Sequence, residues 1–377
     1  MRPLDGKPLI VRTLERAREC FPLVPIRIAA PQFDRGGLDI VAASIDNCRV
    51  DYMFDDNPLK RMVAATRDLR GDDTVLRLDG QHCFFQENII GGLLYAVQGD
   101  ELDLAKSPDD YPPPLTGEVW RVSALRHIEH MLGTWPKNAA APHNVHPKFL
   151  AMRSAAGLTT RIVEPPPVSD DQLTHIRAEL GRAFDHDHIE VTKKSIAAGD
   201  QISFHYVLAK RHLSPGEHVL DVASGKGVGG SLLADTASSV VCADLDEGKL
   251  EEGRKLFPRA NLAFSREDVM NLSFPDASFD VVVSMETIEH MDDVDGYLAE
   301  LRRVLKPLGK AVLSTPQNRM GHIPLTPAHV HEFSLDELRY CCRRHFKIEK
   351  VIGLKAGTIY FEDDPVGANS MIFLRAS

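Results

Sequence analysis

The stretch that most constrains the fold of this chain is residues 218–230. Its apolar run ends in Asp221 and predicts a buried parallel strand, and the glycines that follow predict a tight turn into a helix. Because Gly225 and Gly227 carry no side chain, the backbone of this turn can approach a ligand closely. Glycine-rich turns also close strands in proteins that bind nothing, so the turn alone does not establish a site.

The residues downstream of the turn strengthen the prediction. A second apolar run ends in Asp244, about 20 residues further on, where a ribose-binding carboxylate would lie. Asp268 follows, and residues 279–285 and 309–315 predict two more buried strands. With helices between the strands, the three acids would meet at the carboxyl edge of one parallel sheet and build a nucleoside pocket. The sequence therefore predicts an α/β fold with a nucleoside-binding edge.

This pattern resembles the class I S-adenosylmethionine-dependent methyltransferases over roughly residues 180–377. A nicotinamide-dependent enzyme is the alternative for such a turn. However, an acid at the first strand end suits a ligand that carries an α-ammonium and a sulfonium, whereas a pyrophosphate would prefer a bare helix N-terminus. The family often has glycine where this chain has Ala223. The resemblance implies a Rossmann-like sheet of seven strands and S-adenosyl-L-methionine as the cofactor.

The resemblance also implies a set of cofactor-binding residues. Asp244 would accept both ribose hydroxyls, Leu245 would pack on the adenine, and Asp268 would accept the adenine amine. The full predicted set is Asp221, Ala223, Ser224, Gly225, Gly227, Asp244, Leu245, Asp268, Val269 and Ser284.

Three candidate catalytic residues follow the fourth predicted strand, where an acceptor would meet the methyl group. Glu286, Glu289 and His290 have a spacing similar to that of ubiquinone-biosynthesis O-methyltransferases, whose residues are associated with a divalent metal; a site for an ion such as Mg²⁺ is one hypothesis. A plain general base, with His290 oriented by a carboxylate, is another. A structural role at a helix start is the third.

Four further residues are predicted to contact the substrate. His329 and His331 belong to a segment after the fifth strand, where related enzymes place loops that face the acceptor. His205 and Tyr206 belong to a predicted helix that covers the cofactor in methyltransferases. The alternative is that all four are ordinary loop or core residues.

The N-terminal half also alternates helical and strand patterns. Segments such as residues 4–10 and 72–80 resemble cytidylyltransferases of surface-polysaccharide biosynthesis, which have a glycosyltransferase-A-like fold. The chain begins after the basic loop that holds the nucleotide in that family. Gln81 and Thr116 stand where the family has metal-binding aspartates, and neutral side chains are poor Mg²⁺ ligands. Asp79 lies nearby and could compensate. We therefore expect a catalytically inactive domain that serves in docking or dimerisation.

The proline run at 165–167 marks the predicted boundary between the two halves. We expect a cytidylyltransferase-like domain over 1–165, a linker over 166–180 and the methyltransferase domain over 181–377.

The composition of the chain argues against some classes of binding partner. A net charge of −10 argues against nucleic acid as the main partner, and no apolar stretch is long enough for a membrane span. The six cysteines lack metal-like spacing and are typical of reduced thiols in a cytoplasmic protein.

The two resemblances together predict O-methylation of a sugar, either nucleotide-linked or at the end of a glycan, by a chain that could form a homodimer. A small-molecule or quinone O-methyltransferase, N-methylation of an amino sugar, and a bifunctional cytidylyltransferase–methyltransferase remain alternatives.

Overall fold

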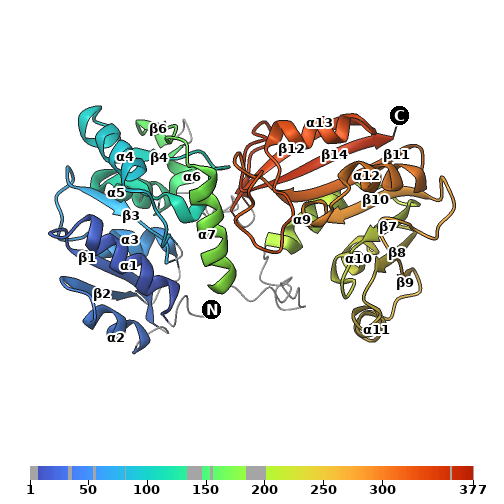
Figure 1. Ribbon diagram of the computed structural model, residues 1–377, viewed down its shortest axis with the longest axis horizontal. Coiled ribbons are helices and arrows are strands. Elements are labelled where there is room, and N and C mark those ends of the chain that lie inside the picture. The colour runs from blue at the N-terminus through green and yellow to red at the C-terminus, as the bar shows by residue number, and fades with distance from the viewer. Residues whose placement is uncertain are drawn as a thin grey trace. The chain divides into compact units, whose positions relative to one another are not determined.

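The structure is a computed structural model that describes residues 7–32, 36–53, 57–80, 82–133, 147–152, 156–183, 201–356 and 359–376. The chain divides into two compact units, Met1–Asp185 and His186–Ser377, which are described separately (Figure 1).

Unit 1 is an α/β unit, as predicted for this half. Its helices are α1 (Leu9–Cys20), α2 (Gly37–Ala43), α3 (Pro58–Ala65), α4 (Glu87–Gly99), the 3₁₀ turn η2 (Pro113–Leu115), α5 (Val122–Gly133), α6 (Pro147–Ala151) and α7 (Asp170–Ala183). Its strands are β1 (Ile26–Pro31), β2 (Cys48–Met53), β3 (Thr74–Arg77), β4 (Leu104–Lys106), β5 (Glu118–Arg121) and β6 (Thr160–Ile162). In the described part, β1 and β2 form a parallel pair, and a second sheet has the order β3-β5-β4-β6. The glycosyltransferase-A-like arrangement stays a prediction.

Helix α7 occupies most of the segment that was expected to be a linker. Ser169 and Gln172 exchange hydrogen bonds at its start, in the manner of a capping box. Leu173, Ile176 and Leu180 are buried along one face of the helix, at the spacing that a packed helix requires. The proline run thus ends where a helix of unit 1 begins, because the residues after it carry both a cap and an apolar face.

Unit 2 is built on one large sheet. Its helices are α9 (Gln201–Arg211), α10 (Val228–Leu233), α11 (Glu247–Leu256), the 3₁₀ turn η4 (Ile288–His290), α12 (Val294–Val304) and α13 (Leu335–Arg343). Its strands are β7 (His218–Val222), β8 (Ser239–Asp244), β9 (Leu262–Arg266), β10 (Phe279–Met285), β11 (Leu305–Pro316), β12 (Phe346–Ala356), β13 (Ile359–Tyr360) and β14 (Asn369–Ala376). The strand order is β13-β12-β14-β11-β10-β7-β8-β9.

The order confirms a Rossmann-like methyltransferase sheet but corrects the strand number. Strands β7 to β11 run parallel, and β14 inserts antiparallel between β11 and β12. The described strands number eight rather than the predicted seven, because the two-residue strand β13 pairs with the edge of β12. So short a strand leaves no periodic signal in the sequence.

Helices cover both faces of this sheet. Val219 and Tyr206 belong to one hydrophobic cluster with α9 and α10, whereas Leu220 and Tyr297 belong to another with α12 and α13. Neighbouring residues of β7 thus point to opposite faces, as strand geometry requires. Since both faces are buried, ligands can reach the sheet only at its edges, and the carboxyl ends of the parallel strands are the usual place.

No helix in the described ranges combines the length and the apolar character that crossing a membrane would need.

Candidate active site

Asp221 is the penultimate residue of β7 and lies inside the protein. Its Oδ1 accepts a hydrogen bond from the Tyr206 hydroxyl at 3.0 Å, whereas Oδ2 has no partner among the described residues. Burial raises the pKa of Asp221 to about 7, against the opposing effects of Tyr206 and the Gly230 amide. The Ser224 hydroxyl is also buried without a partner in the described part. Buried polar atoms in this state are costly unless a ligand satisfies them, and they fit a cationic amino-acid group.

The turn after β7 bends through left-handed backbone conformations. Ala223, Gly225 and Gly227 have φ values of 51°, 56° and 70°, and Gly227 caps α10. A Cβ at Gly227 would lie 2.5 Å from Phe264, and one at Gly229 would lie 2.0 Å from the Tyr206 ring. Glycine at 227 and 229 is therefore a packing requirement, and Ala223 carries a side chain in a conformation that glycine adopts more easily.

Asp244 ends β8 beside this turn. One carboxylate oxygen accepts the Gly225 amide at 2.7 Å and the other accepts the Asp246 amide at 2.9 Å. Leu245 follows with 62% of its surface exposed, an apolar surface next to an acid. The acid and the exposed leucine fit the ribose and adenine roles that the resemblance implies.

Asp268 lies next along the same edge. The amide of the preceding residue, Glu267, bonds the carbonyl of Asp244 at 3.0 Å, which places Asp268 beside β8. Asp268 itself is exposed and accepts a hydrogen bond from the Met270 amide at 2.9 Å, and Val269 is partly buried against the hydrophobic cluster that contains Leu220. The structure therefore brings together Asp221, Asp244 and Asp268.

Ser284 pairs with Val222 near the same edge, but its side chain is turned into the core. It is buried in β10, and its hydroxyl shares a hydrogen bond of 2.5 Å with the Tyr297 hydroxyl in the core against α12. A residue that the sequence reasoning missed is Glu267, whose carboxylate binds Ser265 and both the amide and hydroxyl of Ser273. It fixes the loop that carries Asp268.

Glu286 follows β10 at the same edge, with φ at 51°. Its carboxylate accepts bonds from the Ser314 hydroxyl at 2.8 Å and the Asn369 amide at 2.9 Å. Burial raises its pKa to about 7 although these donors act in the opposite direction. His205 is fully buried behind it, with Nδ1 3.0 Å from the Ser314 hydroxyl and 3.5 Å from Glu286 Oε1.

Three other side chains form the group best suited to a metal ion in the described part of the chain. Ligand atoms of Glu289, His290 and His329 all lie within 4.8 Å of one another. Glu289 is buried and accepts the Thr315 hydroxyl through Oε2, whereas its Oε1 has no partner among the described residues. Burial, strengthened by the Glu286 charge, raises the pKa of Glu289 well above its ordinary value. His329 thus stands where the sequence analysis placed Glu286.

The remaining substrate candidates divide between the core and the surface. Tyr206 is buried and serves Asp221, so neither it nor His205 forms an exposed lid. His331 is half-buried, packs edge-on against Phe333 and lies 3.8 Å from Glu337.

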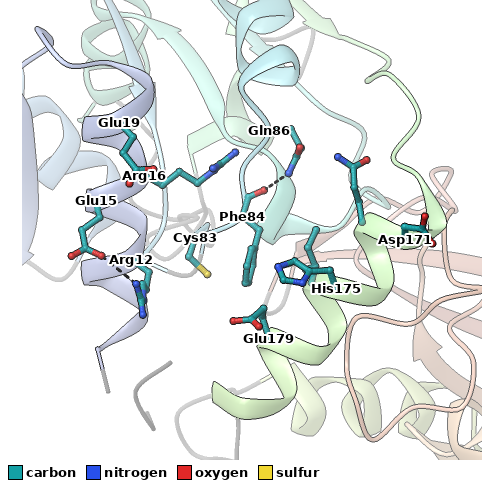
Figure 2. Close-up of a pocket in the computed structure, with 12 residues that line it drawn as sticks. Arg12, Glu15, Arg16, Glu19, Cys83, Phe84, Gln86, Asp171, His175 and Glu179 are labelled. Carbon is teal, nitrogen blue, oxygen red and sulfur yellow. Dashed lines mark hydrogen bonds and ion pairs between the residues drawn. The ribbon is translucent and has the colours of Figure 1, made fainter. Parts of the chain in front are cut away.

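Unit 1 contains a separate cavity of about 570 Å³ (Figure 2). Arg12 and Glu15 of α1, Phe84, and His175 and Glu179 of α7 contribute to its lining. Acidic and basic side chains mix around it, and neither Asp79 nor Thr116 lines it. Thr116 instead bonds the Ser107 hydroxyl at 2.7 Å, Asp79 accepts a bond from Arg77, and Gln81 lies outside the described residues.

Known proteins match this chain as follows. A family described as "Methyltransferase domain" matches residues 220–313. A "Probable S-adenosylmethionine-dependent methyltransferase" of Mycolicibacterium smegmatis is 34% identical over 176 residues, which are 45% of this chain and 67% of the relative. A protein of the same description from Mycobacterium tuberculosis (strain ATCC 25618 / H37Rv) is 36% identical over 125 residues, 32% of this chain and 44% of the relative. A "Demethylmenaquinone methyltransferase" of Beutenbergia cavernae is 38% identical over 105 residues, 27% of this chain and 43% of the relative. The chain thus spans less than half the length of the last two.

Proposed function

The chain belongs to the S-adenosylmethionine-dependent methyltransferases, and we propose that unit 2 methylates a hydroxyl group of a sugar, with unit 1 as a docking or dimerisation domain. The observation that carries the hydroxyl assignment is the group of Glu289, His290 and His329. Glu289 and His290 follow β10, and His329 follows β11, at the sheet edge that also holds Asp221 and Asp244.

The residues that would hold the cofactor are those of the turn and the neighbouring strand ends. Asp221 and Ser224 offer buried polar atoms to the methionine portion, Asp244 offers a carboxylate to the ribose, and Leu245 offers an apolar surface to the adenine. When bound, S-adenosylmethionine supplies a methyl group already activated by the sulfonium charge. The chain's task is then to align the acceptor, exclude water and remove the hydroxyl proton.

His290 is the residue we assign to proton removal. Its ring is exposed, and Nδ1 lies 3.0 Å from the Ala328 carbonyl, which can only accept a hydrogen bond. This contact favours the tautomer with the proton on Nδ1, which makes Nε2 the basic atom. In its ionised form, Glu289 beside it would stabilise the imidazolium that forms.

The same group also fits a divalent metal, since the Oε1 atom of Glu289 is buried without a partner in the described ranges. One carboxylate and two imidazoles suit a first-row transition ion better than Mg²⁺, which prefers oxygen ligands. Glu289, His290 and His329 would hold such an ion, whose chemistry is to lower the pKa of a coordinated hydroxyl.

A sugar acceptor is supported by the sequence resemblance of segments such as residues 4–10 and 72–80 to sugar-activating cytidylyltransferases. A quinol acceptor is the second candidate, because one relative is described as a demethylmenaquinone methyltransferase. The deciding experiment incubates the full chain with radiolabelled S-adenosylmethionine and separate panels of CDP-, UDP- and GDP-sugars, free glycans and hydroquinones. Label transferred to a sugar hydroxyl supports the proposal, and transfer to hydroquinones alone would replace it with the second candidate.

Two variants test the assigned roles in that assay. His290→Ala should abolish turnover while leaving affinity for S-adenosylhomocysteine nearly unchanged. His218→Ala, at the end of β7 away from the site, is the matched control.

Asp244→Ala should lower S-adenosylhomocysteine affinity at least about 100-fold, because the two charge-assisted hydrogen bonds to the ribose hydroxyls are lost. Asp276→Ala, a surface acid, is its control in calorimetry. Retained affinity in Asp244→Ala would contradict the cofactor assignment.

A further inference from the structure

The segment between β11 and α13 is hydrogen-bonded to the turn that carries Glu289. The amides of Val330 and His331 bond the carbonyl of Glu289 at 2.9 and 3.2 Å, and His290 Nδ1 contacts the carbonyl of Ala328 at 3.0 Å. These contacts bring the backbone of His329 to the two earlier residues of the group. They do not determine which ring nitrogen of His329 faces the group.

A second set of contacts fixes that ring. Glu332 is 6% exposed, and its Oε1 lies 2.8 Å from His329 Nδ1. Its Oε2 accepts a hydrogen bond from the side-chain amide of Asn318 at 2.8 Å, and the backbone N–H of Asn318 donates to the Phe333 carbonyl at 2.9 Å. A Cβ at Gly321 would lie 1.6 Å from the Glu332 carbonyl, so the segment fits tightly around the acid. Glu332 is thus a buried carboxylate held in one position by two side chains.

The chemistry of this contact selects a tautomer. An ionised carboxylate can only accept hydrogen bonds, so Nδ1 of His329 must carry the hydrogen. Nε2 is then the ring nitrogen with a lone pair. Carboxylates that hold a histidine in this way orient the ring and raise its strength as a metal ligand.

We propose that Glu332, held by Asn318, is a positioning residue that presents Nε2 of His329 to Glu289 and His290 and so completes a site for a divalent transition-metal ion. The proposal rests on the metal hypothesis for this group, but it requires no particular acceptor. The sequence analysis assigned no role to Glu332 or Asn318, because their role depends on the path of the segment between β11 and α13.

The side-chain chemistry supplies a specific pair of variants. In Glu332→Gln, the new amide has one acceptor oxygen and one donor nitrogen, so it cannot accept from both His329 and Asn318. In the double variant Glu332→Gln with Asn318→Asp, the new aspartate accepts from the glutamine amide and leaves the glutamine oxygen for His329. The single variant should therefore disturb the ring, and the double variant should restore it.

The control removes a different acid that contacts a histidine in the same unit. Glu349 lies 3.6 Å from His212, which precedes β7 and hence lies toward the amino ends of the parallel strands, and Glu349→Gln is the matched change. His329→Ala reports the loss of the ligand itself. Calorimetry with S-adenosylhomocysteine verifies that each variant keeps a folded cofactor site.

The test uses the full chain and two readouts. Nitrogen-15 spectra of labelled histidine should show His329 with its hydrogen on Nδ1 in the wild type and in the double variant, and a mixture of tautomers in Glu332→Gln. Electron paramagnetic resonance with Mn²⁺ alone should show affinity about 10-fold weaker in Glu332→Gln, recovered in the double variant and unchanged in Glu349→Gln.

Two results would overturn the inference. One is a wild-type His329 with its hydrogen on Nε2. The other is Mn²⁺ affinity that falls in His329→Ala but not in Glu332→Gln. Failure of the proposed sugar methylation would leave both readouts intact, so the two proposals fail separately.

Discussion

Ala223 occupies a backbone conformation that costs alanine more than glycine. Its φ of 51° is left-handed, where a Cβ approaches the following carbonyl oxygen. We predict that Ala223→Gly raises the free energy of unfolding by up to about 1 kcal/mol, since the relief of strain exceeds the entropy that glycine adds to the unfolded chain. Urea denaturation measures this change. Ala299→Gly, on an exposed face within α12, should instead lower it by about 1 kcal/mol, and equal losses in the two variants would contradict the strain argument.

The buried carboxyl of Asp221 makes stability depend on pH. Burial raises its pKa to about 7, from an ordinary value of 3.8, so the folded state binds this proton more tightly than the unfolded chain does. The unfolding free energy should therefore fall as the pH rises from about 4 to about 7, by an amount on the order of a few kcal/mol. Asp221→Asn keeps a hydrogen-bond acceptor for Tyr206 but has no titratable carboxyl. Denaturation at several pH values gives the free energy of unfolding of both proteins. The wild-type value minus the variant value should fall between about pH 4 and pH 7, and a difference that does not vary with pH would refute the prediction.

At the scale of elements, α9 and α10 meet through a glycine and an aromatic ring. A Cβ at Gly229 would lie 2.0 Å from the Tyr206 ring, so Gly229→Ala should destabilise the protein by about 1–3 kcal/mol and weaken S-adenosylhomocysteine binding. Tyr206→Ala removes the obstacle but leaves a cavity. The double variant should consequently be more stable than the sum of the two single effects predicts, and a denaturation cycle measures the coupling. Strict additivity would mean that the two helices do not meet in this way in solution.

The elements also show which features of the structure could be predicted from sequence patterns. The strands that carry Asp221 and Asp244 near their carboxyl ends could be predicted, because an apolar run that leads to an acid is a local signal. Ser284 could not be placed, since a strand buried on both faces has no polar alternation to reveal which way a residue points. The pairing of His329 with Glu289 depends on a segment that begins after β11, and no local pattern encodes such a long-range contact. Helix α7 did have a local signal, the helical spacing of Leu173, Ile176 and Leu180, but the neighbouring proline run led to the prediction of a linker.

At the scale of the whole molecule, unit 2 holds its own core. The two hydrophobic clusters that sandwich its sheet consist entirely of residues between 204 and 376, and the cofactor residues lie in the same range. The fragment 186–377 is larger than the minimum size that a single domain needs to fold independently. We predict that it unfolds cooperatively in urea and binds S-adenosylhomocysteine within about threefold of the full chain's affinity, because every residue that we assign to the cofactor lies within unit 2.

The matched comparison is methyl transfer by the same fragment. If unit 1 docks the acceptor, the fragment should keep its cofactor affinity but show a higher KM for the sugar, with kcat little changed, because binding energy remote from the reacting atoms is lost. Calorimetry measures the cofactor affinity, and initial rates measure KM and kcat. A fragment that binds S-adenosylhomocysteine and has the full chain's KM would assign unit 1 to dimerisation instead. Sedimentation would then show the full chain as a dimer and the fragment as a monomer.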